Sequence, residues 1–256
     1  MLSLFLLSLV QSVTEFLPVS SSGHLYLLNF FGISEQGIAL DVLLHLGTLL
    51  AVLIYFSKDI WELILSLLPK KDKQLLLNLI IATIPVMVVG LFFFHLLSKV
   101  RSPIFVAINS IFWGIILWGV DKLSPREKTL KELNLKRAFI IGCAQILSLI
   151  PGTSRSGITI TCARVLGINR IESARFSMLL SIPTISAAVV YVIYKGFQGE
   201  VQMPSWNVGV GAVFLTMFMG LLAITFLMRW VKKGSFGIFA LYRILLGLFV
   251  LGYIIF

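Results

Sequence analysis

Charged residues are scarce in this sequence, and most signals of a soluble fold are missing. Asp, Glu, Lys and Arg make up 12% of the 256 residues, against about 25% in ordinary soluble domains. The only two cysteines, Cys143 and Cys162, lie inside apolar stretches, which excludes a disulfide scaffold and a zinc site of Cys and His. Because 58% of the residues are apolar, a disordered chain, a collagen-like fibre and a water-soluble globule are excluded as well.

The basic residues, which outnumber the acidic ones by 21 to 11, lie mostly in short connections between apolar runs. In a soluble protein the net charge of +10 would suggest a nucleic-acid partner. Basic connections between apolar runs are instead the usual signal of membrane topology. We therefore expect the partner to be the bilayer and not a nucleic acid.

The apolar runs are of two kinds. Six are long enough for spans of about 20 residues: residues 38–56, 75–97, 103–120, 176–194, 207–228 and 236–256. Four shorter ones form two pairs, 2–17 with 24–33 and 137–150 with 158–168. Turn-forming residues split each pair, PVSSSG at 18–23 and PGTSRSG at 151–157. The pattern predicts an all-α integral membrane protein with six transmembrane helices and two re-entrant helix hairpins.

The two interrupted pairs are also repeats of each other. Aligning Gln11 with Gln145 places three residues of the first break on identical residues of the second: Ser20 on Ser154, Ser22 on Ser156 and Gly23 on Gly157. Three spans follow each hairpin, so the second copy must enter the membrane from the opposite face. We expect a single membrane domain over residues 1–256, built as an inverted-topology repeat of about 1–120 and 137–256.

The distribution of basic residues predicts the orientation. Fifteen lysines and arginines fall on one side of the expected spans, and three, Lys99, Arg101 and Lys195, fall on the other. By the positive-inside rule the first side is cytoplasmic. Both termini are then outside the cytoplasm, the first hairpin opens outward and the second opens inward.

Gln11 and Glu15 stand four residues apart in a helical run and therefore share one face. Glu15 precedes Pro18 by three residues, at the deep end of its half-helix. A carboxylate there can accept a proton or hold a divalent cation, with the Gln11 carbonyl as a further oxygen ligand. The alternative is a Glu that only satisfies amides of the neighbouring break.

The next half-helix begins with Ser20, Ser21, Ser22, Gly23 and His24. Unpaired amides and the helix dipole make such an end attractive to anions, and the serine hydroxyls add donors. Gly23 would let a ligand approach the backbone. Ser21 beside His24 offers a nucleophile with a base or an acid. An ordinary serine N-cap followed by an incidental histidine is the alternative.

The second break repeats this arrangement with Arg155 at its centre. An arginine is unfavourable at a helix N-terminus, so another interaction must hold it there. A bound phosphate does so, because a guanidinium and the flanking amides both match phosphate oxygens. The phosphate is then expected beside Ser154, Ser156 and Gly157. A structural ion pair between Arg155 and Glu15 is the alternative.

Other ionisable residues in apolar segments are weaker candidates. His45 is interpreted as a packed helix histidine. Arg164 and Arg170 lie at or past the end of the second short helix, where cations are favourable without any ligand. Arg243 is expected to pair with a carboxylate or to reach lipid headgroups.

The segments QSVTEFLPVSSSGHL (residues 11–25) and LIPGTSRSGITI (149–160) closely resemble the two signature regions of the undecaprenyl-diphosphate phosphatase family, also called bacitracin resistance protein. The resemblance continues through HLGTLLAV, IIATIP, RFSMLLSIP and YRILLGLFVLG, at 45–52, 80–85, 175–183 and 242–252, and so covers nearly the whole chain.

This resemblance implies hydrolysis of undecaprenyl diphosphate to undecaprenyl phosphate and phosphate in the bacterial inner membrane. The reaction recycles the lipid carrier of cell-wall synthesis and confers bacitracin tolerance. It also implies a divalent cation, Mg²⁺ or Ca²⁺. The family roles transfer onto the E/Q-x-x-x-E pair and two further groups: Gln11 and Glu15; Ser20, Ser21 and His24; Ser154, Arg155, Ser156 and Thr159. Many members have Glu at the position of Gln11, so Glu15 alone supplies the negative charge here.

Several alternatives stay open at this point. The nucleophile is Ser21 assisted by His24 or Glu15, a water activated by Glu15, or His24 itself. A transporter or flippase of a phosphorylated polyprenyl lipid would use the same residues and the same inverted repeat. The oligomeric state is also open, a homodimer included.

Overall fold

The computed structural model describes residues 2–33, 37–98, 102–124 and 127–255, and these are helical with no strand among them. The α-helices are α1 (Leu2–Phe16), α2 (Ser21–Phe30), α3 (Ile38–Tyr55), α4 (Ser57–Leu65), α5 (Gln74–Ser98), α6 (Pro103–Leu123), α7 (Leu135–Ile146), α8 (Arg155–Val165), α9 (Arg170–Phe197), α10 (Trp206–Lys233) and α11 (Gly237–Ile255). Two 3-10 turns, η1 (Leu130–Glu132) and η2 (Leu147–Leu149), precede and follow α7.

Six helices are long and apolar enough to cross a membrane, namely α3, α5, α6, α9, α10 and α11, so the chain is a multi-pass membrane protein. They coincide with the six expected spans, although α9 begins at Arg170 and not near 176. Asn169 caps its polar first turn by accepting from the Glu172 amide at 2.9 Å. Lys99, Arg101 and Arg126, which enter the charge count, lie outside the described residues.

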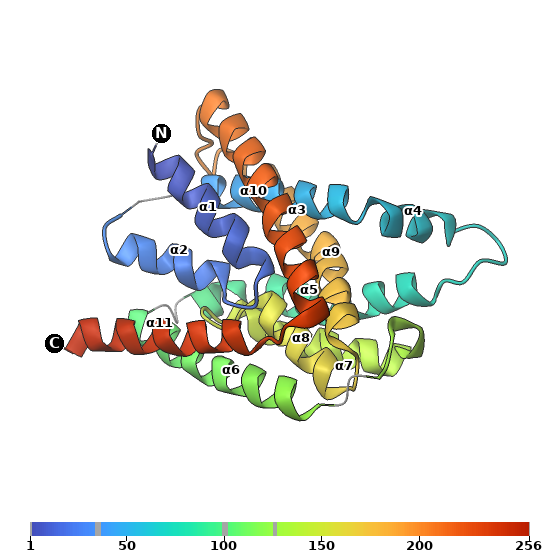
Figure 1. Ribbon diagram of the computed structural model, residues 1–256. Coiled ribbons are helices and arrows are strands. Elements are labelled where there is room, and N and C mark those ends of the chain that lie inside the picture. The colour runs from blue at the N-terminus through green and yellow to red at the C-terminus, as the bar shows by residue number, and fades with distance from the viewer. Residues whose placement is uncertain (1, 34–36, 99–101, 125–126, 256) are drawn as a thin grey trace.

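Helix α4 was not expected from the sequence. It follows α3 directly at Phe56 and carries Asp59 and Glu62, so its charge excludes it as a span. It projects from the body of the molecule together with the connection to α5 (Figure 1).

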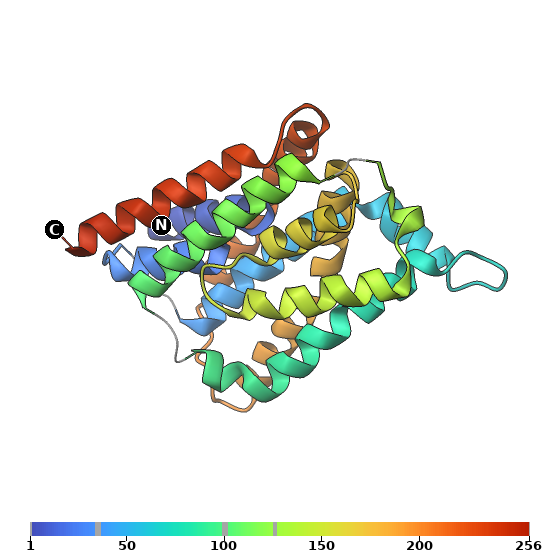
Figure 2. The same ribbon diagram turned by 90° about the horizontal axis from the view of Figure 1, so that it is seen from below.

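The two short helix pairs, α1–α2 and α7–α8, pack against spans from opposite halves of the chain. Helix α1 lies along α10, and α7 lies along α5, while α6 and α11 run side by side (Figures 1 and 2). Helices α3 and α9 pack against each other. Each hairpin thus packs against a span of the other half of the chain, as an inverted repeat predicts. The repeat boundaries and the re-entrant path of the hairpins stay predictions.

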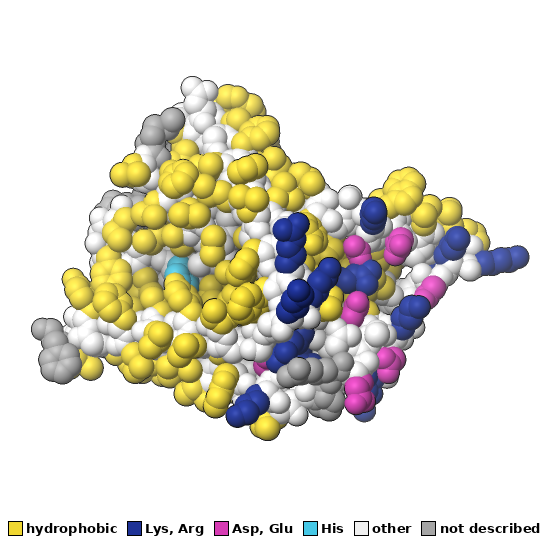
Figure 3. All heavy atoms as spheres, in the orientation of Figure 1, with side chains coloured by type: hydrophobic (Ala, Val, Ile, Leu, Met, Phe, Trp, Pro, Cys, Tyr) yellow, Lys and Arg dark blue, Asp and Glu magenta, His cyan; other side chains and the backbone are white. Residues whose placement is uncertain are grey.

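A buried cluster holds the short helices between the spans. Phe16 of α1, Ile160 of α8 and Phe176 of α9 are each 0% exposed and belong to it. Large apolar side chains instead cover much of the outer surface, and charged side chains gather on one side of it (Figure 3). Such an apolar exterior suits a lipid environment.

An ion-pair cluster fixes the far end of α8. Asp121 of α6 accepts from Arg164 Nε at 3.3 Å and from Arg170 Nε at 2.7 Å. Arg164, which is 0% exposed, also donates to the carbonyls of Ile168 and Ser124. These contacts fit the expected structural role of the two arginines, and burial in apolar surroundings adds the need for a carboxylate partner, Asp121.

Candidate active site

Ser20 and Ser154 end the two breaks in the same unusual backbone conformation. Their φ angles are +80° and +74°, in the region that favours glycine. Each hydroxyl accepts from the amide three residues on, that of Gly23 at 3.4 Å and that of Gly157 at 3.0 Å. Both serines are therefore N-caps of α2 and α8. Their contact with a substrate stays a prediction.

Close packing leaves little room for a side chain at Gly23 and less at Gly157. A Cβ on Gly23 would lie 3.5 Å from the Gly152 Cα, which belongs to the other break. A Cβ on Gly157 would lie 2.8 Å from Nη1 of Arg243, which is too close. The approach of a ligand to the Gly23 backbone stays a prediction.

The two breaks are held together by hydrogen bonds. Ser156 Oγ donates to the Leu17 carbonyl at 3.0 Å. The buried guanidinium of Arg243 bridges both breaks: Nη1 donates to the Pro18 carbonyl at 3.3 Å, and Nη2 donates to the carbonyls of Gly152 and Thr153 at 2.9 Å each. The expectation that Arg243 binds a carboxylate or a lipid headgroup is wrong, because these main-chain carbonyls occupy its guanidinium.

The Glu15 carboxylate is the common acceptor of the site. Arg155 Nη2 donates to its Oε1 at 2.7 Å. Ser21 Oγ and Gln11 Nε2 donate to its Oε2 at 2.6 and 3.1 Å. The Glu15 side chain is 6% exposed, so water screens the Arg155 ion pair only weakly. Ser21 and Arg155, which come from the two different breaks, thus bind the two oxygens of one carboxylate.

Arg155 is positioned from α9 as well as from Glu15. Its Nη1 donates to the Ser177 carbonyl at 2.9 Å. The Ser177 hydroxyl lies 2.7 Å from Oγ1 of Thr159, which also donates to the Arg155 carbonyl at 2.9 Å. Thr159 therefore lies one helical turn after Arg155 and links α8 to α9 through Ser177.

His24 points away from Ser21 and Glu15. Its Nδ1 donates to the Ser20 carbonyl at 2.7 Å, and its Nε2 accepts from the Tyr242 hydroxyl at 2.7 Å. The two rings are nearly parallel, with centroids 5.6 Å apart. The expected pairing of Ser21 with His24 is therefore not the one present, since the Ser21 hydroxyl donates to Glu15 instead.

His45 and Ser22 complete the picture of the predicted residues. His45 donates from Nδ1 to the Asp41 carbonyl at 2.7 Å, which directs Nε2 to within 3.5 Å of Glu15. It is thus a neighbour of the carboxylate and not only a packed helix residue. The Ser22 side chain is exposed at the start of α2, and its proposed contact with substrate stays a prediction.

Sequence reasoning missed Ser177, Tyr242 and Asn109, and it named Arg243 with the wrong partners. Asn109 Nδ2 donates to the Pro151 carbonyl and to Thr153 Oγ1, at 2.8 Å each, and so fixes the second break from α6. All of them lie in otherwise apolar spans, where a polar side chain needs a buried partner. Ser177 and Tyr242–Arg243 also fall inside the segments RFSMLLSIP and YRILLGLFVLG.

Comparison with known proteins gives one family. A sequence model described as bacitracin resistance protein BacA matches residues 4–249. An undecaprenyl-diphosphatase of Roseobacter denitrificans is 44% identical over 260 residues, which cover 98% of this chain and 97% of the relative. Those of Gemmatimonas aurantiaca and Elusimicrobium minutum are 42% and 43% identical, over 95% and 96% of this chain and 94% and 95% of the relatives.

Proposed function

This chain belongs to the bacitracin resistance protein BacA family, and we propose that it hydrolyses undecaprenyl diphosphate to undecaprenyl phosphate and inorganic phosphate. The observation that carries the chemistry is the Glu15 carboxylate, held between the Ser21 hydroxyl and the Arg155 guanidinium. Phosphoryl transfer needs a positioned nucleophile, a proton acceptor and a cation for the phosphoryl oxygens. These three residues supply one of each.

The diphosphate head lies where the first turns of α2 and α8 meet. The amides of both turns and the two helix dipoles favour an anion there. Arg155 pairs with Glu15 in the structure, which is the alternative that the sequence left open. A diphosphate carries more charge than one carboxylate and offers two oxygens to the guanidinium, so Arg155 exchanges Glu15 for the substrate. The exchange frees Oε1 of Glu15.

Ser21 then attacks the terminal phosphorus. A bond forms between Ser21 Oγ and phosphorus, the bond from phosphorus to the bridging oxygen breaks, and undecaprenyl phosphate leaves. The Ser21 proton passes to Glu15 Oε2, which already accepts from this hydroxyl at 2.6 Å. Water next attacks the phosphorus of the phosphoserine, and the bond between Ser21 Oγ and phosphorus breaks. Glu15 returns its proton to Ser21 Oγ, and the proton lost by the water leaves with inorganic phosphate. His24 orients the start of α2 through Ser20 and Tyr242.

A second route uses the same carboxylate without a covalent intermediate. Water bound beside the phosphate loses its proton to Glu15 and attacks in line. Ser21 then serves only as a hydrogen-bond donor, so the two routes differ in what the loss of its hydroxyl costs.

The donor set fits a divalent cation only in part. Among the described residues no group of three or more His, Cys, Asp or Glu side chains is placed to hold a metal. Gln11 Oε1 is buried without a hydrogen-bond partner, beside the Glu15 carboxylate. These two residues would hold Mg²⁺ or Ca²⁺ together with phosphate oxygens, as is usual for Mg²⁺. The cation would neutralise charge on the diphosphate.

We also propose the orientation that the basic residues indicate, with both termini outside the cytoplasm of a bacterial inner membrane. Arg229 and Lys233 at the end of α10 then face the cytoplasm, and the α1–α2 break opens outward. Cysteine labelling of Ser3→Cys in intact spheroplasts by a membrane-impermeant maleimide tests this. Labelling without lysis is expected, and labelling only after lysis would reverse the topology.

Phosphate release from undecaprenyl diphosphate by the purified protein in detergent tests the activity. We expect stoichiometric release of inorganic phosphate, its loss on addition of a chelator, and its return with Mg²⁺ or Ca²⁺. A monodisperse protein that releases no phosphate, yet moves the lipid across the bilayer of reconstituted vesicles, would instead be a flippase.

Ser21→Ala separates the two routes. Attack by Ser21 predicts almost complete loss of phosphate release and, in the unmodified protein, transient labelling of Ser21 by a ³²P-labelled terminal phosphate. The water route predicts a measurable residual rate in Ser21→Ala and no labelled protein.

A further inference from the structure

The end of α10 carries a surface pocket that the proposed reaction does not use. Its cavity volume is about 650 Å³, and its walls come from α10 itself and from Gly234, which ends the helix. The pocket lies where a span that begins at Trp206 ends at Lys233. It is therefore placed at the level where a span meets lipid headgroups.

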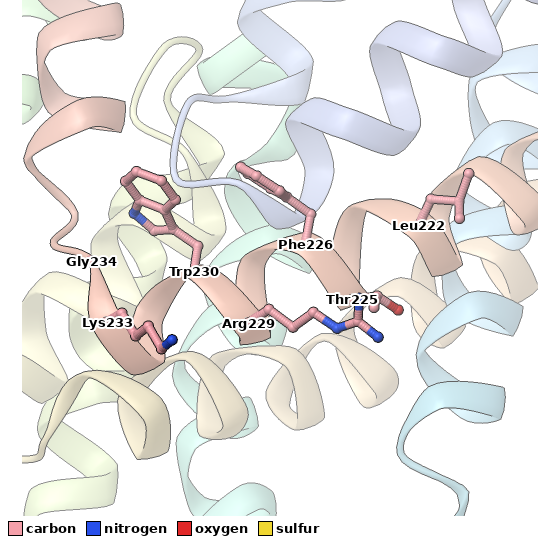
Figure 4. A pocket seen from close by; sticks show the side chains of 7 residues that line it. All are labelled: Leu222, Thr225, Phe226, Arg229, Trp230, Lys233 and Gly234. Carbon is pink, nitrogen blue, oxygen red and sulfur yellow. The ribbon is translucent and has the colours of Figure 1, made fainter.

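Two rows of side chains line the pocket, each with a four-residue spacing. Thr225, Arg229 and Lys233 form a polar row, and Leu222, Phe226 and Trp230 form an apolar row. Residues four apart share one face of a helix, so the rows run side by side along α10. Figure 4 shows the Arg229 and Lys233 side chains along one edge and the two aromatic rings along the other.

The aromatic row is held in place. Trp230 Nε1 donates to the Ser235 carbonyl at 2.9 Å, and the Phe226 and Trp230 rings stack with centroids 6.0 Å apart. Tryptophan is enriched at the headgroup level of membranes because its ring is apolar and its N–H is polar. Leu222, at the other end of this row, lies about 12 Å deeper along the helix at 1.5 Å per residue.

The cationic row has no anion inside the protein. Arg229 and Lys233 are exposed, and in the described part of the chain neither forms an ion pair. Cations at a helix C-terminus are favourable by themselves. That effect explains the charge but not an ordered aromatic row beside it, which a headgroup with an attached chain does explain.

We propose that this pocket binds an anionic phospholipid. Arg229 and Lys233 hold the headgroup phosphate, since a guanidinium presents paired donors to phosphate oxygens and basic pockets at membrane ends select such lipids. One acyl chain lies along Trp230, Phe226 and Leu222 toward the membrane interior. The two cations select an anionic headgroup over a zwitterionic one.

Native mass spectrometry of the full-length protein in detergent, titrated with phosphatidylglycerol or phosphatidylcholine, tests the proposal. Tighter binding of phosphatidylglycerol is expected. Arg229→Gln and Lys233→Gln should each weaken it about 5-fold, and the double variant about 30-fold, at about 1 kcal/mol per basic residue. Lys232→Gln is the matched control, because it removes the same charge at the same helix end but does not line the pocket.

Phe226→Ala should weaken both lipids alike, because it shortens the apolar row without changing charge. Phosphate release in lipid-free detergent should be unchanged in the Arg229 and Lys233 variants, so the result does not depend on the proposed reaction. Equal affinity for the two lipids overturns the proposal. So does an equal effect of Lys232→Gln and Lys233→Gln, or binding of undecaprenyl phosphate in place of phosphatidylglycerol.

Discussion

The α1–α2 break and the α7–α8 break end in the same way and carry different side chains. In both, a serine with positive φ caps the following helix and a glycine three residues on receives the cap. At aligned positions, however, Ser21 of the first break corresponds to Arg155 of the second, His24 corresponds to Ile158, and Glu15 corresponds to Leu149. The duplication thus supplies two anion-attracting helix ends, while the chemistry is divided between them. The proposed reaction centre lies where the two breaks meet.

The spans around the breaks differ too. Helix α10 packs closely along α3, whereas its counterpart α5 touches α9 much less. An apolar cleft of about 480 Å³ lies between α5 and α9, lined by residues such as Leu79, Ile84 and Ile182. The spans of the two halves of the chain therefore pack unequally.

Removing the cation of the second break should have the largest effect. Arg155→Ala should lower phosphate release about 10³-fold or more, because the proposed reaction assigns no other cationic side chain to stabilise the negative charge of the diphosphate. Arg155→Lys should recover only part, since an ammonium lacks the paired donors. Size-exclusion and thermal-melting profiles like those of the unmodified protein would show that folding is intact. Near-normal release would remove Arg155 from the mechanism.

Removing the carboxylate of the first break should come next. Glu15→Gln should lower release by about 10²- to 10⁴-fold, because both routes need it as proton acceptor. The response to added Mg²⁺ should weaken as well. A variant that keeps full stimulation by Mg²⁺ would place the cation elsewhere. Equal release by Glu15→Gln and the unmodified protein would contradict both routes.

The glycines test how tightly each break is packed. Gly157→Ala should lower the free energy of unfolding by about 1–3 kcal/mol, because its Cβ would collide with Arg243, which three carbonyls hold in place. Gly23→Ala should cost less, since its closest new contacts are at 3.2 and 3.3 Å. Melting temperatures of the two variants in one detergent give the comparison. The reverse order would mean that the Arg243 side chain moves away from an added Cβ more easily than the Val106 side chain does.

The capping serines should give the smallest and most symmetrical effects. Ser20→Ala and Ser154→Ala lose the cap and keep the positive φ, at a cost of about 0.5–2 kcal/mol. Ser20→Gly and Ser154→Gly lose the cap but relieve the backbone, so they should be at least as stable as the alanine variants. If the alanine variant proved more stable than the glycine variant at either position, the positive φ would not be what lowers the stability there.

Much of the fold could be predicted because it depends on local composition. The spans follow from apolar length, and the breaks follow from Pro, Gly and Ser. Helix α4 could not be found this way, because a short amphipathic helix with Asp59 and Glu62 resembles a polar connection. The start of α9 at Arg170 was missed for a related reason, since a helix can begin before the apolar part of a span.

At the site, the sequence singled out Glu15, Ser21 and Arg155, and the structure brings Ser21 and Arg155 into hydrogen bonds with Glu15. It could not assign their partners. Whether Ser21 bonds to His24 or to Glu15 depends on side-chain directions at the start of α2. Arg243 was placed wrongly because its three acceptors are carbonyls of segments some 90 and 225 residues away in the chain.

The amino-acid order alone predicted how many helices are long and apolar enough to cross the lipid and where the two pairs of short helices are interrupted, since hydrophobic length and turn chemistry act over a few neighbouring residues. Tertiary packing decided which oxygen each donor reaches, because backbone carbonyls and buried charges find partners only after distant helices have come together. Arg243 reaching both breaks, and Glu15 accepting from both halves of the chain, belong to that second kind of information.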